Sequence, residues 1–427
     1  MNSVAKILII SCILCISAKA HEYEVVASRT EKTPLYICYV MHNHVDQYTF
    51  PLDLFIKDLM FLDIFRIKSE KTDSVLNKKD RSSLLENGYG LGIFIIESDK
   101  YIDMYIHDLS ADKTIIGKRI EKNRIARYLG HKAADIVVSH LLSHESFFLT
   151  KVAYVKEALN NSNSSSHGRM LCVADYDGSS EQIVNEKSLP IFGTRWSDQS
   201  NKPMLFYSEH TKSNIRLMAI DQSKKKHICA SGDGITMLPA SFPGGNRIIY
   251  CATGTNGYTQ LFLYTIEGTK QITFYEGNSL SPSITADGKN VYFCSDFQTG
   301  HPQIYLYMLD ENKVEKITQD GYCTSPSVSL KSGKVAYTRM IKGLMQLMIY
   351  NPHNKTHVQL TFDEGNKDCP SWSPCGTNIM YGFDNGIQQR IGILNIVTHK
   401  NRFITPAHVK CSYPAWSPVY KQFPIFI

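Results

Sequence analysis

The sequence predicts two parts, a small α/β domain and then an all-β propeller of six blades that is closed by the C-terminal strand. Prolines recur every 43 or 44 residues, at positions 239, 282, 326, 370 and 414. All three tryptophans share one phase of this period, because Trp196, Trp372 and Trp416 are separated by multiples of 44 residues. Four short apolar stretches per period, separated by turn residues, are typical of propeller blades.

One repeat shows the four strands of a blade clearly. A tight turn at Asp287-Gly288 separates the first two predicted strands, and glycine supplies the positive φ that such turns need. Downstream repeats place Leu360-Thr361 and Ile404-Thr405 at the fourth strand. The four strands of the clearest repeat are predicted at Ser281–Ile284, Val291–Cys294, Gln303–Leu306 and Val314–Thr318.

The two ends of the repeat region determine the number of blades in residues 150–427. Five complete repeats run from about residue 190 to about residue 409. Before them, Val152–Val155, Arg169–Val173 and Gln182–Val184 match the second, third and fourth strands of a blade. Tyr413–Ser417 matches a first strand. We therefore expect the C-terminal strand to complete the first blade, which closes a ring of six blades without an open sheet edge.

The first twenty residues predict a cleavable export signal. Lys6 precedes an apolar stretch, Ile7–Ile16, and Ala18-Lys19-Ala20 then supplies small residues for cleavage after Ala20. Ten apolar residues are too few to cross a bilayer, and no later stretch approaches twenty. The mature chain is therefore expected to lack a transmembrane segment. A lipid-anchoring thiol at Cys12 or Cys15 is the alternative, although the local sequence matches a lipobox poorly.

Residues 21–147 carry no repeat and predict the small α/β domain. Pro51–Arg66 predicts a helix with one apolar face, and Ile125–Leu141 predicts a second helix. Ile93–Ile96 predicts a buried strand, and the alternation in Tyr101–Leu109 predicts a half-exposed one. These elements indicate helices that cover a sheet.

Composition and motifs argue against several classes of function. The net charge of +6 without long basic runs does not favour nucleic-acid binding. The chain has no Gly-x-Ser-x-Gly elbow and no His-Glu-x-x-His motif. Gly88–Gly92 precedes a strand, whereas a dinucleotide fingerprint opens a helix, and Asp175–Gly178 is interpreted as a hairpin turn. His42, His44, His140 and His144 are interpreted as surface residues. We predict no catalytic, cofactor-binding or metal site.

The cysteines indicate packing. Cys251 and Cys294 occupy a repeat position that holds small residues in sister blades, which predicts buried free thiols. Cys369 and Cys375 bracket one strand and would lie too far apart for a disulfide. Nine cysteines remain after the export signal, so at least one thiol is free or paired between chains.

Three stretches resemble the TolB family of the periplasmic Tol–Pal system. Several blades depart from the family's Trp-Ser-Pro-Asp-Gly turn, as at Phe242–Gly245, but keep its turn chemistry. The resemblance covers essentially the whole mature chain and implies a six-bladed propeller and a periplasmic location. The stretches that carry it are Ala126–Asp135, Ala174–Gly178 and Tyr413–Pro418.

The resemblance also implies a function. It predicts a non-enzymatic adaptor that supports outer-membrane integrity and envelope constriction during cell division. The loops at one mouth of the propeller would bind the peptidoglycan-associated lipoprotein, Pal. The predicted mouth residues are Ile235, Leu238, Leu280, Ser281, Thr324, Ser325, Asp368, Cys369, Ser412 and Tyr413.

The resemblance implies a second partner, TolA, at the mature N-terminus. The segment that would bind TolA contains Glu22, Tyr23, Glu24, Val25 and Val26, which form a first sheet strand in an equally favoured interpretation. The alternative function is a periplasmic propeller that binds or cleaves a small saccharide or peptide. No acid/base pair can be assigned for such cleavage.

Overall fold

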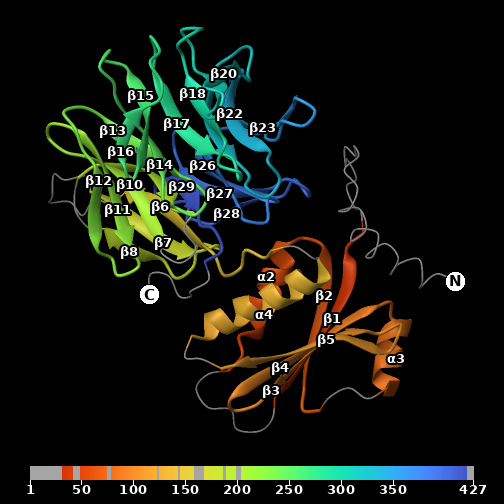
Figure 1. The fold of residues 1–427 in the computed structure, drawn as a ribbon. Helices are drawn as coiled ribbons and strands as arrows, with labels where there is room; N and C mark the ends of the chain where they lie inside the picture. The colour runs from red at the N-terminus through yellow and green to blue at the C-terminus, as the bar shows by residue number, and fades with distance from the viewer. Residues whose placement is uncertain are drawn as a thin grey trace. The chain divides into compact units, whose positions relative to one another are not determined.

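Figure 1 shows the computed structural model of the chain, which divides into two compact units, residues 1–149 and 150–427. The predicted export signal, the segment Glu22–Val26, and His42, His44 and His144 lie outside the described residues. No helix in the described ranges is long and apolar enough to cross a membrane. The structure describes residues 31–41, 49–74, 78–122, 125–142, 145–157, 168–185, 189–198 and 203–420.

The first unit contains a five-stranded sheet with the order β2-β1-β3-β4-β5. β1 pairs in parallel with β2 and β3, whereas β4 and β5 extend the sheet antiparallel. This confirms the predicted α/β region. Its strands are β1 (Thr33–Met41), β2 (Phe65–Thr72), β3 (Leu91–Glu97), β4 (Tyr101–Asp108) and β5 (Lys113–Glu121), and its helices are α2 (Leu52–Phe61), α3 (Lys78–Glu86) and α4 (Ala126–Leu141).

Helices α2 and α4 pack closely together. A Cβ atom on Gly130 would lie 2.9 Å from Pro51 Cγ, so only glycine permits this approach without a shift. Next to it, buried His131 Nδ1 lies 2.7 Å from Asp58 Oδ2 on α2. A buried charge is tolerated when it is paired in this way.

The predicted helix Pro51–Arg66 is too long. Helix α2 ends at Phe61, and β2 begins four residues later at Phe65. Asp63 between them has φ of 61°, a left-handed conformation that cannot continue an α-helix. Phe65 and Arg66, at the end of the predicted helix, therefore belong to a strand.

The second unit consists of six four-stranded sheets, which confirms the predicted six-bladed propeller. We number these blades from the one that contains residue 151. The first blade contains β29 (Cys411–Trp416), β6 (Lys151–Glu157), β7 (Arg169–Asp175) and β8 (Gln182–Asn185); the second β9 (Ile191–Trp196), β10 (Met204–His210), β11 (Ile215–Asp221) and β12 (Lys226–Ala230); the third β13 (Thr236–Ser241), β14 (Ile248–Thr253), β15 (Thr259–Thr265) and β16 (Gly268–Gln271).

Within each blade the strands follow one another antiparallel, and we call the first strand in this order the inner strand. The fourth blade contains β17 (Ser279–Ile284), β18 (Asn290–Ser295), β19 (Gln303–Met308) and β20 (Lys313–Lys316); the fifth β21 (Cys323–Val328), β22 (Val335–Ile341), β23 (Leu344–Asn351) and β24 (Thr356–Gln359); the sixth β25 (Asn366–Trp372), β26 (Asn378–Asp384), β27 (Gln389–Asn395) and β28 (Asn401–Phe403).

The C-terminal strand β29 is the inner strand of the first blade, as the repeat predicts. It pairs antiparallel with β6, where Ser412 faces Val155 and Trp416 faces Val152. Trp416 Nε1 donates to Thr150 Oγ1 at 2.8 Å. The ring is therefore closed by contacts between residues more than 250 positions apart.

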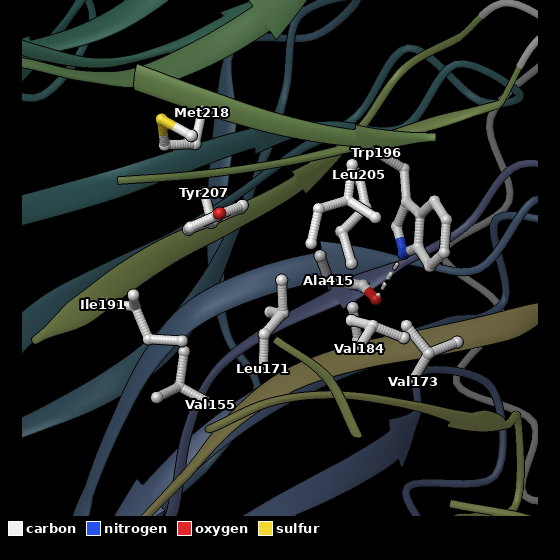
Figure 2. Close-up of a cluster of buried hydrophobic side chains, with 12 residues drawn as sticks. Val155, Leu171, Val173, Val184, Ile191, Trp196, Leu205, Tyr207, Met218 and Ala415 are labelled. Carbon is white, nitrogen blue, oxygen red and sulfur yellow. Dashed lines mark hydrogen bonds between the residues drawn. The ribbon is translucent and has the colours of Figure 1, made fainter. Parts of the chain in front are cut away.

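The tryptophans connect neighbouring blades. Trp196 Nε1 of the second blade donates to Ala415 O of the first at 3.1 Å, above a buried apolar cluster that both blades share (Figure 2). Trp372 Nε1 makes the corresponding bond to Ser327 O of the fifth blade at 2.9 Å. The phase shared by Trp196 and Trp372 thus reflects a repeated hydrogen bond between blades, whereas the Trp416 indole donates to Thr150 beside its own blade.

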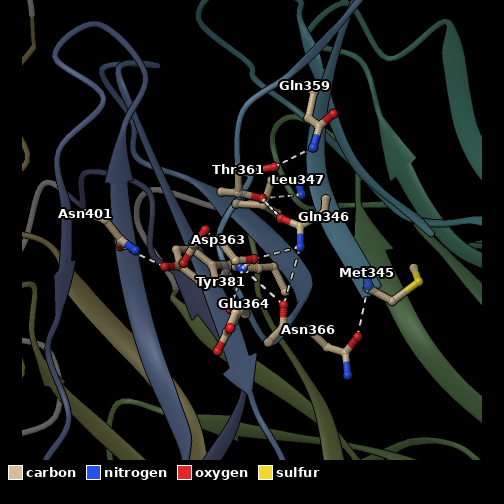
Figure 3. Close-up of polar contacts among 12 residues, drawn as sticks. Met345, Gln346, Leu347, Gln359, Thr361, Asp363, Glu364, Asn366, Tyr381 and Asn401 are labelled. Atoms are coloured by element: carbon tan, nitrogen blue, oxygen red, sulfur yellow. Dashed lines mark hydrogen bonds and ion pairs between the residues drawn. The ribbon is translucent and has the colours of Figure 1, made fainter. Parts of the chain in front are cut away.

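The fourth strand is shorter than predicted in three blades. β20 ends at Lys316, two residues before the predicted end at Thr318. β24 ends at Gln359 and β28 at Phe403, so Leu360-Thr361 and Ile404-Thr405 lie just beyond them. Threonine recurs at the position of Thr361 because its hydroxyl accepts a hydrogen bond from Leu347 N at 2.9 Å and donates one to Gln346 Oε1 at 2.6 Å (Figure 3). The repeated threonine marks the loop into the next blade rather than a strand.

A chain that ends at Lys410 is predicted to unfold or aggregate, because it lacks the whole strand β29. Removing one buried tryptophan side chain alone costs about 3–5 kcal/mol, against a total stability of about 5–15 kcal/mol. Circular dichroism during heating measures the loss, with Trp416→Ala as the milder variant. A truncated chain that melts like the full one would contradict closure by β29.

Candidate partner-binding face

One end of the propeller collects all the loops that lead into the inner strands. Because neighbouring strands are antiparallel, the turn between the second and third strand of each blade lies at this same end. We call this end the mouth face and the other end the opposite face. The predicted mouth residues lie in the early part of five inner strands, or directly before β13 in the case of Ile235.

Every inner strand is bulged at the same repeat position. The register shifts between Leu280 and Ser283 in β17, and at equivalent places in the other inner strands. Five residues directly before the repeated prolines have φ between 50° and 54°, and the sixth position is Gly193 with φ of 67°. The five are Leu238, Ser281, Ser325, Cys369 and Tyr413.

These bulges have an energetic cost and a geometric result. A left-handed conformation at a residue with a side chain costs roughly 1–2 kcal/mol. Five of the six repeats nevertheless have such a residue at this position. Bulges redirect side chains at sheet ends. Here Ser325 Oγ donates to Asp368 Oδ1 of the next blade at 2.7 Å. Half of the predicted mouth residues are therefore the bulged residues themselves.

The structure brings the ten predicted residues to one end of the inner strands and leaves all of them at least partly exposed. Asp368 is the most exposed of them. Thr324 Oγ1 lies 2.8 Å from Thr338 Oγ1, which fixes it within its own blade. No partner is present in the structure, so their role in binding remains a prediction.

Larger apolar side chains that the sequence reasoning missed lie in other loops of the mouth face. Phe362 is 77% exposed and Phe274 is 68% exposed, each in a loop that leads into an inner strand. Ile387 is 84% exposed at a turn between the second and third strands. Tyr258 and Tyr322 are also exposed there. These five residues, which we call the apolar rim, belong to the third to sixth blades.

Buried polar side chains donate hydrogen bonds to the backbone of the loops that carry the apolar rim. Gln260 Nε2 donates to Tyr275 O at 2.8 Å and to Gly277 O at 3.0 Å in the loop that carries Phe274. Gln346 Nε2 donates in the same way to Asp363 O at 3.1 Å (Figure 3). The rim is thus supported by hydrogen bonds to its own backbone.

Lys367 adds a second support under Phe362. Its side chain is completely buried, and Nζ donates to Asp363 O at 2.6 Å, Glu364 O at 2.8 Å and Gly365 O at 3.0 Å. The Asp363 carboxylate lies 3.0 Å from the same ammonium group. A buried charge with this many oxygen partners rigidifies the loop, because losing any partner is costly.

The fold and this face can be compared with known proteins. The profile of the family described as TolB beta propeller domain (PD40) matches residues 138–420, about two thirds of the chain. The chain belongs to this family. This confirms the TolB resemblance that the sequence predicts, and the family's propeller includes all of the mouth residues.

Individual relatives and structures agree with the TolB family. Proteins called "Tol-Pal system protein TolB" are 26% identical over 165 residues in Wigglesworthia glossinidia brevipalpis and 32% identical over 137 residues in Hydrogenovibrio crunogenus. These alignments cover 38% and 31% of this chain and 37% and 31% of those proteins, so the chain spans about a third of their length. The crystal structure of TolB from Acinetobacter baumannii covers 91% of this chain and 97% of its own, with TM-score 0.76 at 19% identity, which shows the fold.

The TolB-family propeller of this chain carries free thiols. Within the described residues of the propeller no cysteine forms a disulfide, and Cys251 and Cys294 are buried, as predicted. Desolvation raises the pKa of Cys251 to about 12 and that of Cys229 to about 11. No group of three or more potential metal ligands occurs within the described part of the chain.

Thiol labelling is predicted to be slow in the native protein. The thiolate is the reactive form, and because burial raises the pKa of these thiols, little thiolate is present at pH 8. Iodoacetamide should therefore label the native chain slowly and the urea-unfolded chain rapidly, as measured by intact mass. Three or more intrachain disulfides in unreduced protein, or equal labelling of both states, would contradict this.

Proposed function

We propose that this chain is a non-enzymatic adaptor of the Tol–Pal system whose mouth face binds the peptidoglycan-associated lipoprotein. The relatives called "Tol-Pal system protein TolB" support membership of that system. The observation that carries the proposal is the apolar rim, where Phe362, Phe274 and Ile387 are each more than two thirds exposed at the end of the propeller where the bulged inner strands begin.

The chemistry of this face suits protein binding. Aromatic and large aliphatic side chains dominate the energetics of protein interfaces, and polar groups at the border provide specificity. The loops under the rim are held by Gln260, Gln346 and Lys367, so little conformational entropy would be lost when a partner binds. The face combines fixed backbone with exposed apolar contacts, and the proposal includes no catalytic step.

The proposal extends to the N-terminus and to location. The export signal at residues 1–20 would deliver the chain to the periplasm, with cleavage after Ala20, and the following segment Glu22–Val26 would bind TolA. Binding at both places would connect an inner-membrane complex to an outer-membrane lipoprotein. The adaptor would in this way support outer-membrane integrity during cell division.

Phe362→Ser is predicted to weaken lipoprotein binding at least about tenfold, because a hot-spot side chain contributes 2 kcal/mol or more. Isothermal titration with the soluble, lipid-free domain of the lipoprotein measures the affinity. Ile266→Ser is the matched control, since Ile266 is 97% exposed on the opposite face in the turn between β15 and β16. Equal affinity of the two variants would remove the mouth face from the proposal.

Deletion of residues 21–30 is predicted to abolish binding to TolA while leaving lipoprotein binding to the propeller in place. The melting temperature should change little, since the deleted segment precedes every described strand. Pull-down with the soluble domain of TolA provides the measurement, and the undeleted chain is the control. Unchanged TolA capture would contradict a role for this segment and favour the sheet-strand interpretation.

A further inference from the structure

One arginine interrupts the sixfold pattern of the inner strands. Arg195 in β9 occupies the position directly after the bulge, where it pairs with Phe206. The equivalent residues in the other blades are small. They are Ala240, Ser283, Ser327, Ser371 and Ala415, each the first paired residue after the register shift.

Arg195 lies on one of the six inner strands, each of which contacts the inner strand of the next blade around the propeller axis. Its guanidinium group interacts electrostatically with the thiols of Cys251 and Cys369 and acts to lower the pKa of each, against the larger rise caused by desolvation. Cys251 belongs to the third blade and Cys369 to the sixth, and these two blades face each other across a ring of six. This influence on thiols of two opposite blades agrees with a position of the guanidinium group near the axis.

Arg195 has donor capacity that the protein leaves unused. Arginine carries five N–H donors in a planar fork, and here one of its terminal nitrogens, Nη1, donates to Thr194 O at 3.0 Å. Within the described part of the chain, no carboxylate lies at ion-pair distance from it. The side chain is partly exposed. Other partly buried arginines of the propeller make more contacts. Arg216 pairs with Glu209 at 2.6 Å. Arg390 donates from two nitrogens to Thr405 O and lies over the Phe403 ring.

We propose that Arg195 forms a binding site for a carboxylate inside the propeller, on the axis below the mouth face. The planar fork of a guanidinium matches the two oxygens of a carboxylate. The small equivalent residues leave the surrounding positions of the inner strands without long side chains. This site is separate from the apolar rim, and it does not depend on the proposed lipoprotein binding.

The charges around the axis favour a monoanion over a dianion. Asp368 lies at the mouth on β25, where it accepts bonds from Ser325 Oγ and from its neighbour Cys369 N, both at 2.7 Å. Its carboxylate interacts with Cys369, the same thiol on which Arg195 acts. A single guanidinium beside this acidic group balances one negative charge better than two. Acetate is therefore expected to bind more tightly than inorganic phosphate.

The test uses ¹³C-labelled acetate with the full mature chain at constant ionic strength set by chloride. Broadening of the acetate carboxyl signal is expected with the wild-type chain and with Lys355→Gln, which removes an exposed positive charge far out on the fifth blade. Arg195→Gln should weaken acetate binding by about tenfold or more, because a charge-assisted hydrogen bond is lost. Equal broadening by Arg195→Gln and wild type, or none by wild type, would overturn the proposal.

Two further arms make the result decisive. Arg195→Lys keeps the positive charge but lacks the planar fork, so it replaces Arg195→Gln as the test if that variant fails to fold. Weaker broadening of the acetate signal by Arg195→Lys than by wild type supports the site, and unchanged broadening overturns it. Phosphate that displaces acetate at lower concentration than acetate itself would overturn the carboxylate class. Triglycine and its C-terminal amide distinguish the source of the carboxylate. Displacement of acetate by triglycine but not by the amide indicates the C-terminal end of a peptide. Displacement of acetate by neither compound indicates a free small acid.

Discussion

The propeller depends on one pairing, the antiparallel contact between β29 and β6. A four-stranded blade exposes two apolar faces, so each blade is stable only between two neighbours. In this chain the first blade lacks an inner strand until residues 411–416 pair with residues 152–156. The Trp416 bond to Thr150 and the cluster beneath Trp196 depend on the same contact. All six blades are therefore held by a pairing between the two ends of the repeat region.

Much of this arrangement could be predicted because the repeat imposes the same physical demand six times. Proline in the bulge of the inner strand and glycine in the turns recur in register with the tryptophans, so the spacing predicts the blades and their closure. The extents of α2 and of the fourth strands could not be predicted in this way. Asp63 ends the helix by its backbone conformation, and Thr361 recurs for a hydrogen bond that lies beyond its strand.

The residues of the candidate site likewise divide into those that follow the repeat, which could be predicted, and those that do not. Repeat register placed Leu238, Ser281 and Cys369 at the mouth, since inner strands begin there in every blade. Phe362 and Ile387 were missed because loop residues vary between blades and carry no periodic signal. Arg195 could have been found as the single departure from a position that is otherwise alanine or serine. In repeat proteins, the exceptions to the pattern are as informative as the pattern.

The position of β29 also determines when the molecule can fold. A chain that crosses a membrane from its N-terminus delivers β6 early and β29 last, so the first blade stays incomplete until the final strand arrives. The two strands are separated by about 250 residues, and closing so long a loop must precede their pairing. Until then, the edge of β6 and the apolar side of Trp196 are open to other chains. Successful folding thus requires that β29 pair with β6 before other chains bind the open edge.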